Sequence, residues 1–264
     1  MHRVFRPISI LAGCAIMMMV TACNGIFEDI YDEAPATANV TTEGQLLVNA
    51  ASWKDWYYVD FDSLQMYIER KNTAGLLKAQ TNFTHYAIPT SLTSGSGDGK
   101  TGMYTYWFDV FGKGISVNEK RGFTATDAQL EPQSWSIAFH RNNVRTNGGA
   151  VLETKYTSLN ELPKNSSYFL GATFQEDEWT ENEVWEDQSQ MLSSLIGCQG
   201  IKINKVLSSW LKIEIPPMPP AFTMNNHVFI LRLKSGKYAA LQLENYIGAD
   251  GTKCWLRINY KYPY

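Results

Sequence analysis

The side chains best suited to chemistry are few in this chain and lie far apart. Three histidines, His85, His140 and His227, follow the first 22 residues, and no two of them have metal-ligand spacing. No GxSxG, HExxH or GxxxxGK[ST] motif is present. Carboxylates gather in residues 176–187, but a run of charges usually forms a solvated loop. The residues therefore give no positive sign of an enzyme.

The first 23 residues have the pattern of an exported lipoprotein. Arg3 and Arg6 precede an apolar run, 8–20, which is shorter than the roughly 20 residues that a spanning helix needs. A short apolar run behind a basic leader is typical of a cleaved signal peptide, here 1–22. The run ends in Val-Thr-Ala-Cys, which resembles a bacterial lipobox, so Cys23 is expected to carry lipid as the mature N-terminus. The alternative is an ordinary secretory signal in which Cys23 is incidental.

The residues behind Cys23 suggest where the protein resides. The segment contains an acidic patch of four residues, Glu28, Asp29, Asp32 and Glu33. This patch resembles the surface-export signal of Bacteroidetes lipoproteins, although a solvated tether would have the same composition. Residues 34–44 have no periodic pattern and indicate a linker. We therefore expect a tether over 23–44, one domain over 45–264, and a lipid-anchored position at the outer membrane, on the cell surface.

Charge and the remaining cysteines limit the function further. Removal of residues 1–22 takes two of the 23 basic residues and none of the 26 acidic ones, which leaves a formal net charge of −5. With no basic block, nucleic-acid binding has little support. Cys198 and Cys254 lack metal-site spacing, and two alternatives stay open for them: a disulfide or two separate buried thiols.

The elements that must position these residues are expected to be strands. Apolar and polar residues alternate with period two in 256–262, as in a strand with one buried face. Residues 228–233 and 238–246 are also strand-like, and Ser-Gly at 235–236 and Asp-Gly at 250–251 provide the turns between them. Further strands are predicted by aromatic and β-branched content at 56–61, 104–111, 135–140 and 200–204. Turns are predicted at 94–99 and 147–149, and a short helix at 188–195. The predicted fold class is all-β, a single antiparallel domain.

Several separated motifs resemble the HmuY-like haem-binding lipoprotein family of Bacteroidetes. Trp135-Ser-Ile-Ala-Phe-His-Arg141, followed by Arg145-Thr-Asn-Gly-Gly149, is similar to the family's characteristic strand and turn. Further motifs in the C-terminal part occur in the same order as in the family, and the aromatic segment 53–61 resembles the family's first aromatic strand. These C-terminal motifs are Trp210-Leu211, Pro219-Pro-Ala-Phe222, Val228–Arg232, Gly236–Ala239, Tyr246 and Tyr260–Pro263. The similarity covers roughly residues 45–264, although 83–130 is longer than the family needs.

The resemblance implies a function and a set of candidate ligands. Proteins of this family grip one haem between β-fingers, take it from host carriers and pass it to an outer-membrane receptor. Two axial side chains hold the iron, both His or both Met. The family's C-terminal ligand position, five residues after the Trp of the Trp-Leu pair, is Ile215 here, which cannot ligate iron. His140 belongs to the characteristic strand and is not an axial ligand in the family.

A shifted pair of ligands is available. Met191 and Met218 each lie three residues beyond a plausible ligand position, Gln188 for the first and Ile215 for the second. They are the candidate axial ligands, with Met224 and His227 in reserve. In the alternative interpretation, Met191 is a core residue and Met218 a loop residue among prolines.

The leading function is therefore binding of haem, or a related tetrapyrrole, for iron acquisition. The alternative is a binding lipoprotein for another ligand, such as a glycan, on the same scaffold, because Trp and Tyr platforms suit sugar rings as well and Ile215 has lost the ligating side chain. A structural or interaction lipoprotein is a third possibility.

Overall fold

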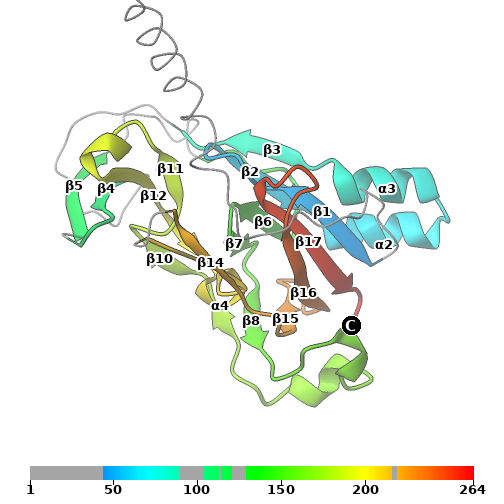
Figure 1. The fold of residues 1–264 in the computed structure, drawn as a ribbon. Helices are drawn as coiled ribbons and strands as arrows, with labels where there is room; N and C mark the ends of the chain where they lie inside the picture. Colours follow the sequence, from blue (N-terminus) through cyan, green and yellow to red (C-terminus); the bar gives the residue numbers. More distant parts are fainter. Residues whose placement is uncertain (1–43, 90–103, 113, 121–128, 216–218) are drawn as a thin grey trace, which may run out of the picture. The chain divides into compact units, whose positions relative to one another are not determined.

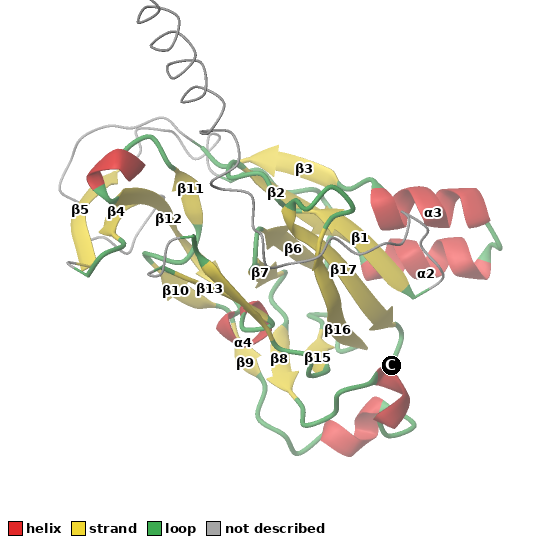
Figure 2. Ribbon diagram, viewed as in Figure 1, coloured by secondary structure: helices red, strands yellow, loops and turns green. Residues whose placement is uncertain are grey.

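The computed structural model describes residues 44–89, 104–112, 114–120, 129–215 and 219–264 (Figure 1). Cys23, the residues before it, the linker up to 43, the predicted turn at 94–99 and Met218 lie outside these ranges. Strands predominate in the described residues, and the pairings between them are antiparallel (Figure 2). The strands are β1 (Gln45–Asn49), β2 (Asp55–Val59), β3 (Thr84–Ala87), β4 (Tyr104–Asp109), β5 (Gly114–Lys120), β6 (Ile137–His140), β7 (Asn143–Thr146), β8 (Ala150–Glu153), β9 (Gln175–Glu176), β10 (Glu178–Thr180), β11 (Trp185–Asp187), β12 (Leu195–Ile203), β13 (Leu211–Glu214), β14 (Ala221–Met224), β15 (Phe229–Arg232), β16 (Tyr238–Ile247) and β17 (Lys253–Lys261). The helices are α2 (Phe61–Glu69), α3 (Thr73–Thr81) and α4 (Lys205–Ser208), with 3-10 turns η2 (Leu159–Glu161), η3 (Ser166–Phe169) and η4 (Met191–Ser193).

The strands form four sheets. The largest has the order β1-β17-β16-β15-β8-β9, and a second has the order β10-β12-β4-β5, with β11 also paired to β12. A third sheet has the order β3-β2-β6-β7, and β13 and β14 form a separate hairpin. The prediction of a mostly β, antiparallel protein is therefore confirmed.

The C-terminal meander follows the predicted pattern closely. β15, β16 and β17 pair in succession, and β1 joins the outer side of β17. Along β17 the residues at 254, 256, 258 and 260 are buried, while those between them are more exposed, so the period of two marks one core face. The predicted turn at 147–149 joins β7 to β8. There Gly148 has φ of +65°, and a Cβ on Gly149 would lie 2.8 Å from the Arg232 carbonyl oxygen, so glycine is required at both positions.

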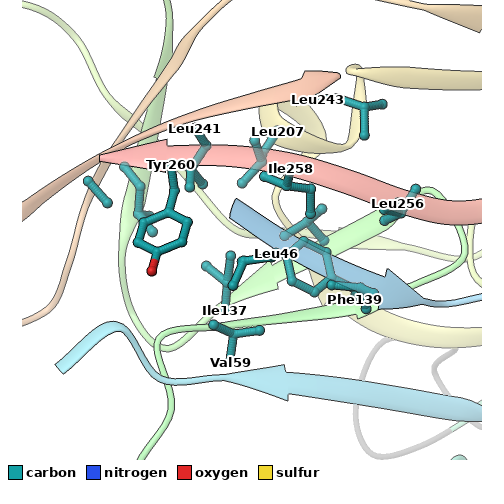
Figure 3. Packing of buried hydrophobic residues seen from close by; sticks show 14 of the residues in the cluster. Leu46, Val59, Ile137, Phe139, Leu207, Leu241, Leu243, Leu256, Ile258 and Tyr260 are labelled. Carbon is teal, nitrogen blue, oxygen red and sulfur yellow. The ribbon is translucent and has the colours of Figure 1, made fainter. Parts of the chain in front are cut away.

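The main core joins the large sheet to the sheet that contains β6. Side chains from β1, β2, β6, β16, β17 and α4 point toward one another in Figure 3. The residues labelled there are Leu46, Val59, Ile137, Phe139, Leu207, Leu241, Leu243, Leu256, Ile258 and Tyr260. Phe139 and Trp210 are both fully buried in this core, and their rings stack at 5.8 Å. The predicted strand residues 135–140 thus provide the inner face of the fold.

The three α-helices of the described residues stand where the sequence pattern predicts a strand or makes no assignment. Asp60 ends β2 early, because its carboxylate accepts a hydrogen bond from the Asp62 amide and caps α2. Phe61 and Leu64, one helical turn apart, are the buried side chains of α2. The prediction of a strand through Phe61 is therefore wrong. The aromatic run continues past the helix cap at Asp60, so it does not mark where the strand ends. At 188–195 the predicted short helix is the 3-10 turn η4.

The two thiols are separate. Cys198 on β12 and Cys254 on β17 are both free, buried, and in different apolar clusters. Burial raises the pKa of each thiol above its usual value, so both stay protonated at neutral pH. Of the alternatives that the sequence left open, the structure contains the two separate buried thiols.

Candidate functional site

A cavity of about 520 Å³ lies beside Ile215, a few residues after the Trp210-Leu211 pair. Its apolar lining comes from three strands and the residues that follow them, and its polar lining from α4, β13 and the loops at 142 and 182–183. The apolar residues are Phe108, Val110, Trp185, Leu211, Ile213 and Ile215. The polar residues are Asn142, Asn182, Glu183, Lys205, Ser208, Ser209, Lys212 and Glu214. This combination of six apolar and eight polar residues suits a flat ligand with apolar faces and a polar edge.

The α4–β13 segment is held in place by hydrogen bonds to β7 and by the core. Asn204 caps α4 by accepting a hydrogen bond from the Leu207 amide, and the Ser208 hydroxyl accepts one from the Val144 amide on β7. The next residue but one, Trp210, is buried in the core. β13 follows directly, and all of its residues, together with Ile215 after it, line the cavity. The Trp-Leu pair that the sequence singled out is therefore the anchor of one cavity wall.

Trp185 on β11 is one of two aromatic residues in the lining, with Phe108. Its ring stacks on that of Trp53 at 5.9 Å, and its Nε1 donates to the Asn182 carbonyl oxygen at 3.1 Å. The Arg141 guanidinium in turn lies 4.5 Å from the centre of the Trp53 ring. The indole plane is thereby fixed before any ligand binds.

The charged residues of the cavity are paired and exposed. The Lys205 ammonium is 3.9 Å from Glu178 and 3.8 Å from Glu183, and Lys212 contacts Glu214. Such exposed ion pairs contribute little to stability. A ligand carboxylate can therefore replace the Glu partner of either lysine at small cost in free energy.

The candidate iron ligands differ in what the structure says of them. Met191 begins η4 and is partly exposed beside a fully exposed Leu192, so it is not a core residue. It does not line the cavity, but the Val110 amide, at the cavity, donates to the Ser194 carbonyl oxygen just after η4. Ile215 lines the cavity and packs against the cluster around Tyr106. Met218 lies outside the described residues.

The reserve candidates and the other histidines lie elsewhere. Met224 pairs with Leu211 across the β13–β14 hairpin and is partly exposed. His227 is hydrogen-bonded to Glu153 through Nδ1 at 2.8 Å, and His85 lies 3.5 Å from Asp55. His140 is fully buried, and both ring nitrogens face main-chain carbonyl oxygens. Burial lowers its pKa to about 4. His140 is not among the residues that line the cavity.

The acidic run at 176–187 is only in part the solvated loop that its composition predicts. It contains β9, β10 and β11. Asp177 is partly buried and accepts hydrogen bonds from the amide and hydroxyl of Thr146 and from Asn204, and burial raises its pKa. Glu186 is buried, on β11, which pairs with β12. Both positions depend on elements distant in sequence, a tertiary effect that a charge pattern does not reveal.

Sequence reasoning missed most of the cavity lining. Phe108 and Val110 belong to the stretch 83–130, longer than the family needs, yet β4 within it pairs with β12 along six residues. Trp185 was hidden in the acidic run. Its position among charges was the available signal, because two Trp residues, Trp179 and Trp185, are unusual in a solvated loop.

The site that the described residues assemble among the antiparallel sheets is a cavity with both apolar and polar lining. Among the described residues no group of three or more His, Cys, Asp or Glu could hold a metal ion. Across the same residues, no helix has the length and apolar character needed to cross a membrane.

Comparison with known proteins identifies the family. The family model described as HmuY protein matches residues 52–260, so the chain belongs to the HmuY family. This is a haem-binding, non-enzymatic family. The curated proteins include no match to this chain.

Solved structures agree with this assignment. A Bacteroides fragilis protein described as a "putative lipoprotein" is 25% identical, with a TM-score of 0.55, over 83% of this chain and 90% of that one. A Bacteroides vulgatus protein described as a "putative HmuY_like heme binding protein" is 26% identical, with a TM-score of 0.51, over 83% and 91%. Apo PinO from Porphyromonas gingivitis, 21% identical over 85% and 97%, shares the fold with a TM-score of 0.58.

Proposed function

We propose that this chain is a lipid-anchored, surface-exposed lipoprotein that binds haem, or a related tetrapyrrole, for iron acquisition. The observation that carries the proposal is the cavity of about 520 Å³ at Ile215, the position of the family's C-terminal iron ligand. Its volume is in the usual range of small-ligand sites, roughly 300–1,000 Å³. The apolar wall with Trp185 fits a porphyrin ring, and Lys205 and Lys212 can meet its carboxylates.

Iron ligation in this proposal comes from methionine. Ile215 offers no donor atom, whereas Met191 is partly exposed just beyond the end of β11. We propose Met191 and Met218 as the axial ligands. A thioether is a neutral, soft ligand that favours ferrous over ferric iron. An outer-membrane haem receptor is the proposed partner that accepts the cargo.

Titration with haemin tests the proposal. The mature chain is expected to bind haemin with a saturable change in the visible spectrum. On reduction of the iron, the absorption bands should sharpen and the affinity should rise. Met191→Leu or Met218→Leu should weaken the ferrous complex on the order of tenfold, since even outer partners of a metal contribute that much. Met66→Leu, on α2, is the control and should bind as wild type does. Unchanged ferrous spectra in both variants would show that neither methionine is a ligand.

A second candidate function is binding of a glycan on the same scaffold. Ile215 favours it, because the family's iron ligand is missing there, and a fixed Trp ring is a good platform for a sugar. Absence of any saturable haem spectrum in wild type, oxidised or reduced, would favour this candidate.

The lipid anchor is tested separately. Metabolic labelling with a fatty acid should tag the wild-type chain, because the thiol of Cys23 is the proposed acceptor. Cys23→Ala should remain unlabelled, and Cys14→Ala, inside the signal peptide, serves as the matched control. Equal labelling of wild type and Cys23→Ala would rule out the anchor.

A further inference from the structure

The turn between β6 and β7 lies against one wall of the cavity, and Asn142 of this turn lines the cavity itself. It comprises the residues from His140 to Asn143, which close the β6–β7 hairpin. Segment 182–185 packs against this turn, and its residues Asn182, Glu183 and Trp185 line the cavity. We call this segment the indole wall.

The indole wall has little support from its own strand pairing. β11 has three residues and pairs only with β12 among the described strands, with a register shift between Trp185 and Asp187. A strand this short forms few ladder hydrogen bonds, so contacts from outside the ladder contribute a larger share of what holds its backbone. Other contacts therefore help to define where the Trp185 ring stands.

Three successive carbonyl groups of the wall are held by other elements. The Glu183 oxygen accepts from Asn143 Nδ2 at 2.8 Å, and the Val184 oxygen accepts from the Gln199 amide at 2.8 Å. The Trp185 oxygen lies 2.7 Å from His140 Nε2. Two of the three therefore depend on side chains of the β6–β7 turn, His140 and Asn143, which are both buried.

His140 joins the wall to a second sheet. Its Nδ1 lies 3.0 Å from the Asp55 carbonyl oxygen on β2, and its ring packs against Trp56 at 5.3 Å. A neutral imidazole carries one N–H and donates to one of these two carbonyl oxygens at a time, and the contact of Nε2 with Trp185 is the shorter of the two. The residue next to it, Arg141, covers Trp53, which in turn stacks on the Trp185 ring. The same turn thus fixes the main chain and the side chain of the wall.

We propose that His140 and Asn143 are positioning residues of the ligand site, which hold the Glu183 and Trp185 carbonyl groups and so keep the indole wall in its binding position. The role of the wall follows from its contacts alone, and the nature of the ligand rests on the proposed function. A wall that is ordered before the ligand arrives lowers the ordering cost of binding.

A matched set of variants separates positioning from general stability. In His140→Gln the side-chain amide can replace Nε2 and still donate to Trp185, whereas in His140→Asn it can replace only Nδ1 and reach Asp55. Asn143→Ala removes the second wall contact. His85→Leu, an exposed histidine on β3, is the control.

Hydrogen exchange of the amides in 182–187 is the first measurement. Loss of one such hydrogen bond is expected to speed exchange there about tenfold in His140→Asn and Asn143→Ala. His140→Gln and His85→Leu should exchange at the wild-type rate. No local increase, an equal increase along the whole chain, or failure of His140→Gln to protect the wall would overturn the proposal.

Haemin dissociation and the position of the main visible band are the second measurement. His140→Asn and Asn143→Ala should release haemin about tenfold faster with a shifted band, while His140→Gln keeps wild-type values. Faster exchange with unchanged haemin release and spectrum would overturn the role of the wall in binding. Absence of haemin binding in wild type would contradict the proposed function, and the exchange data would then decide the positioning role alone.

Discussion

Trp210→Ala is expected to lower the free energy of unfolding by about 3–5 kcal/mol, the usual cost of removing a large buried aromatic side chain. Trp210 is fully buried, and its ring stacks on Phe139 at 5.8 Å with an interplanar angle of 9°. Its Nε1 also donates to the Asn142 carbonyl oxygen at 3.2 Å, so the substitution removes a donor as well as volume. Urea unfolding of wild type and variant gives the difference.

Two companion variants assign this loss to its causes. Trp210→Phe keeps a ring against Phe139 but loses the indole N–H, and should cost less than the alanine variant. Tyr168→Ala, at a largely exposed ring, should change stability by no more than about 0.5 kcal/mol. A loss below about 1 kcal/mol in Trp210→Ala would contradict the view that this residue anchors the α4–β13 segment to the core.

His140 is expected to make the protein less stable in acid by about 3 kcal/mol between pH 7.5 and pH 4. Burial lowers its pKa from 6.5 to about 4 in the folded chain. Between these two values the unfolded chain binds a proton that the folded chain does not, so stability falls as the pH falls. The contribution is fully present above pH 6.5 and is lost as the pH approaches 4.

The groups around the ring set the size of this effect. The carbonyl oxygens of Asp55 and Trp185 and the Asp55 carboxylate favour the imidazolium and raise the pKa, while the neighbouring Arg141 lowers it. Complete burial outweighs the partners that raise the pKa. Asp177, whose pKa is raised, acts in the opposite direction on acidification. A variant at position 140 is therefore needed to isolate the histidine.

The measurement compares urea unfolding of wild type and His140→Gln at several pH values from 7.5 to 4. Gln does not titrate, so the unfolding free energy of wild type should fall by about 3 kcal/mol relative to that of the variant between pH 7.5 and pH 4. His85→Gln, at an exposed histidine, should follow the wild-type curve. A difference that stays constant with pH would mean that the folded and unfolded pKa values of His140 are equal.

The sequence by itself determined the family and the architecture of the C-terminal meander. Alternation such as that of 256–262 reports which residues of a strand face the core, and turns such as Ser235-Gly236 depend on local backbone preferences. The order of the short motifs around Trp135 and Trp210 was sufficient to identify the HmuY family, which the match over 52–260 confirms. Local signals at α2 were also present, since Asp60 is a good helix cap, but the aromatic run before it indicated a strand.

Only the tertiary structure decided what surrounds the candidate site. Whether Cys198 and Cys254 meet depends on which strands pair, and they lie in different clusters. The cavity at Ile215 draws its lining from β4, β11 and β13, which are distant in sequence, and no local pattern reports such a meeting. The indole wall is the clearest case: a Trp within an acidic run becomes a fixed surface because His140 and Asn143, some forty residues earlier, hold its backbone. Local periodicity encodes which face of an element is buried, whereas the partner that covers that face is chosen by long-range packing.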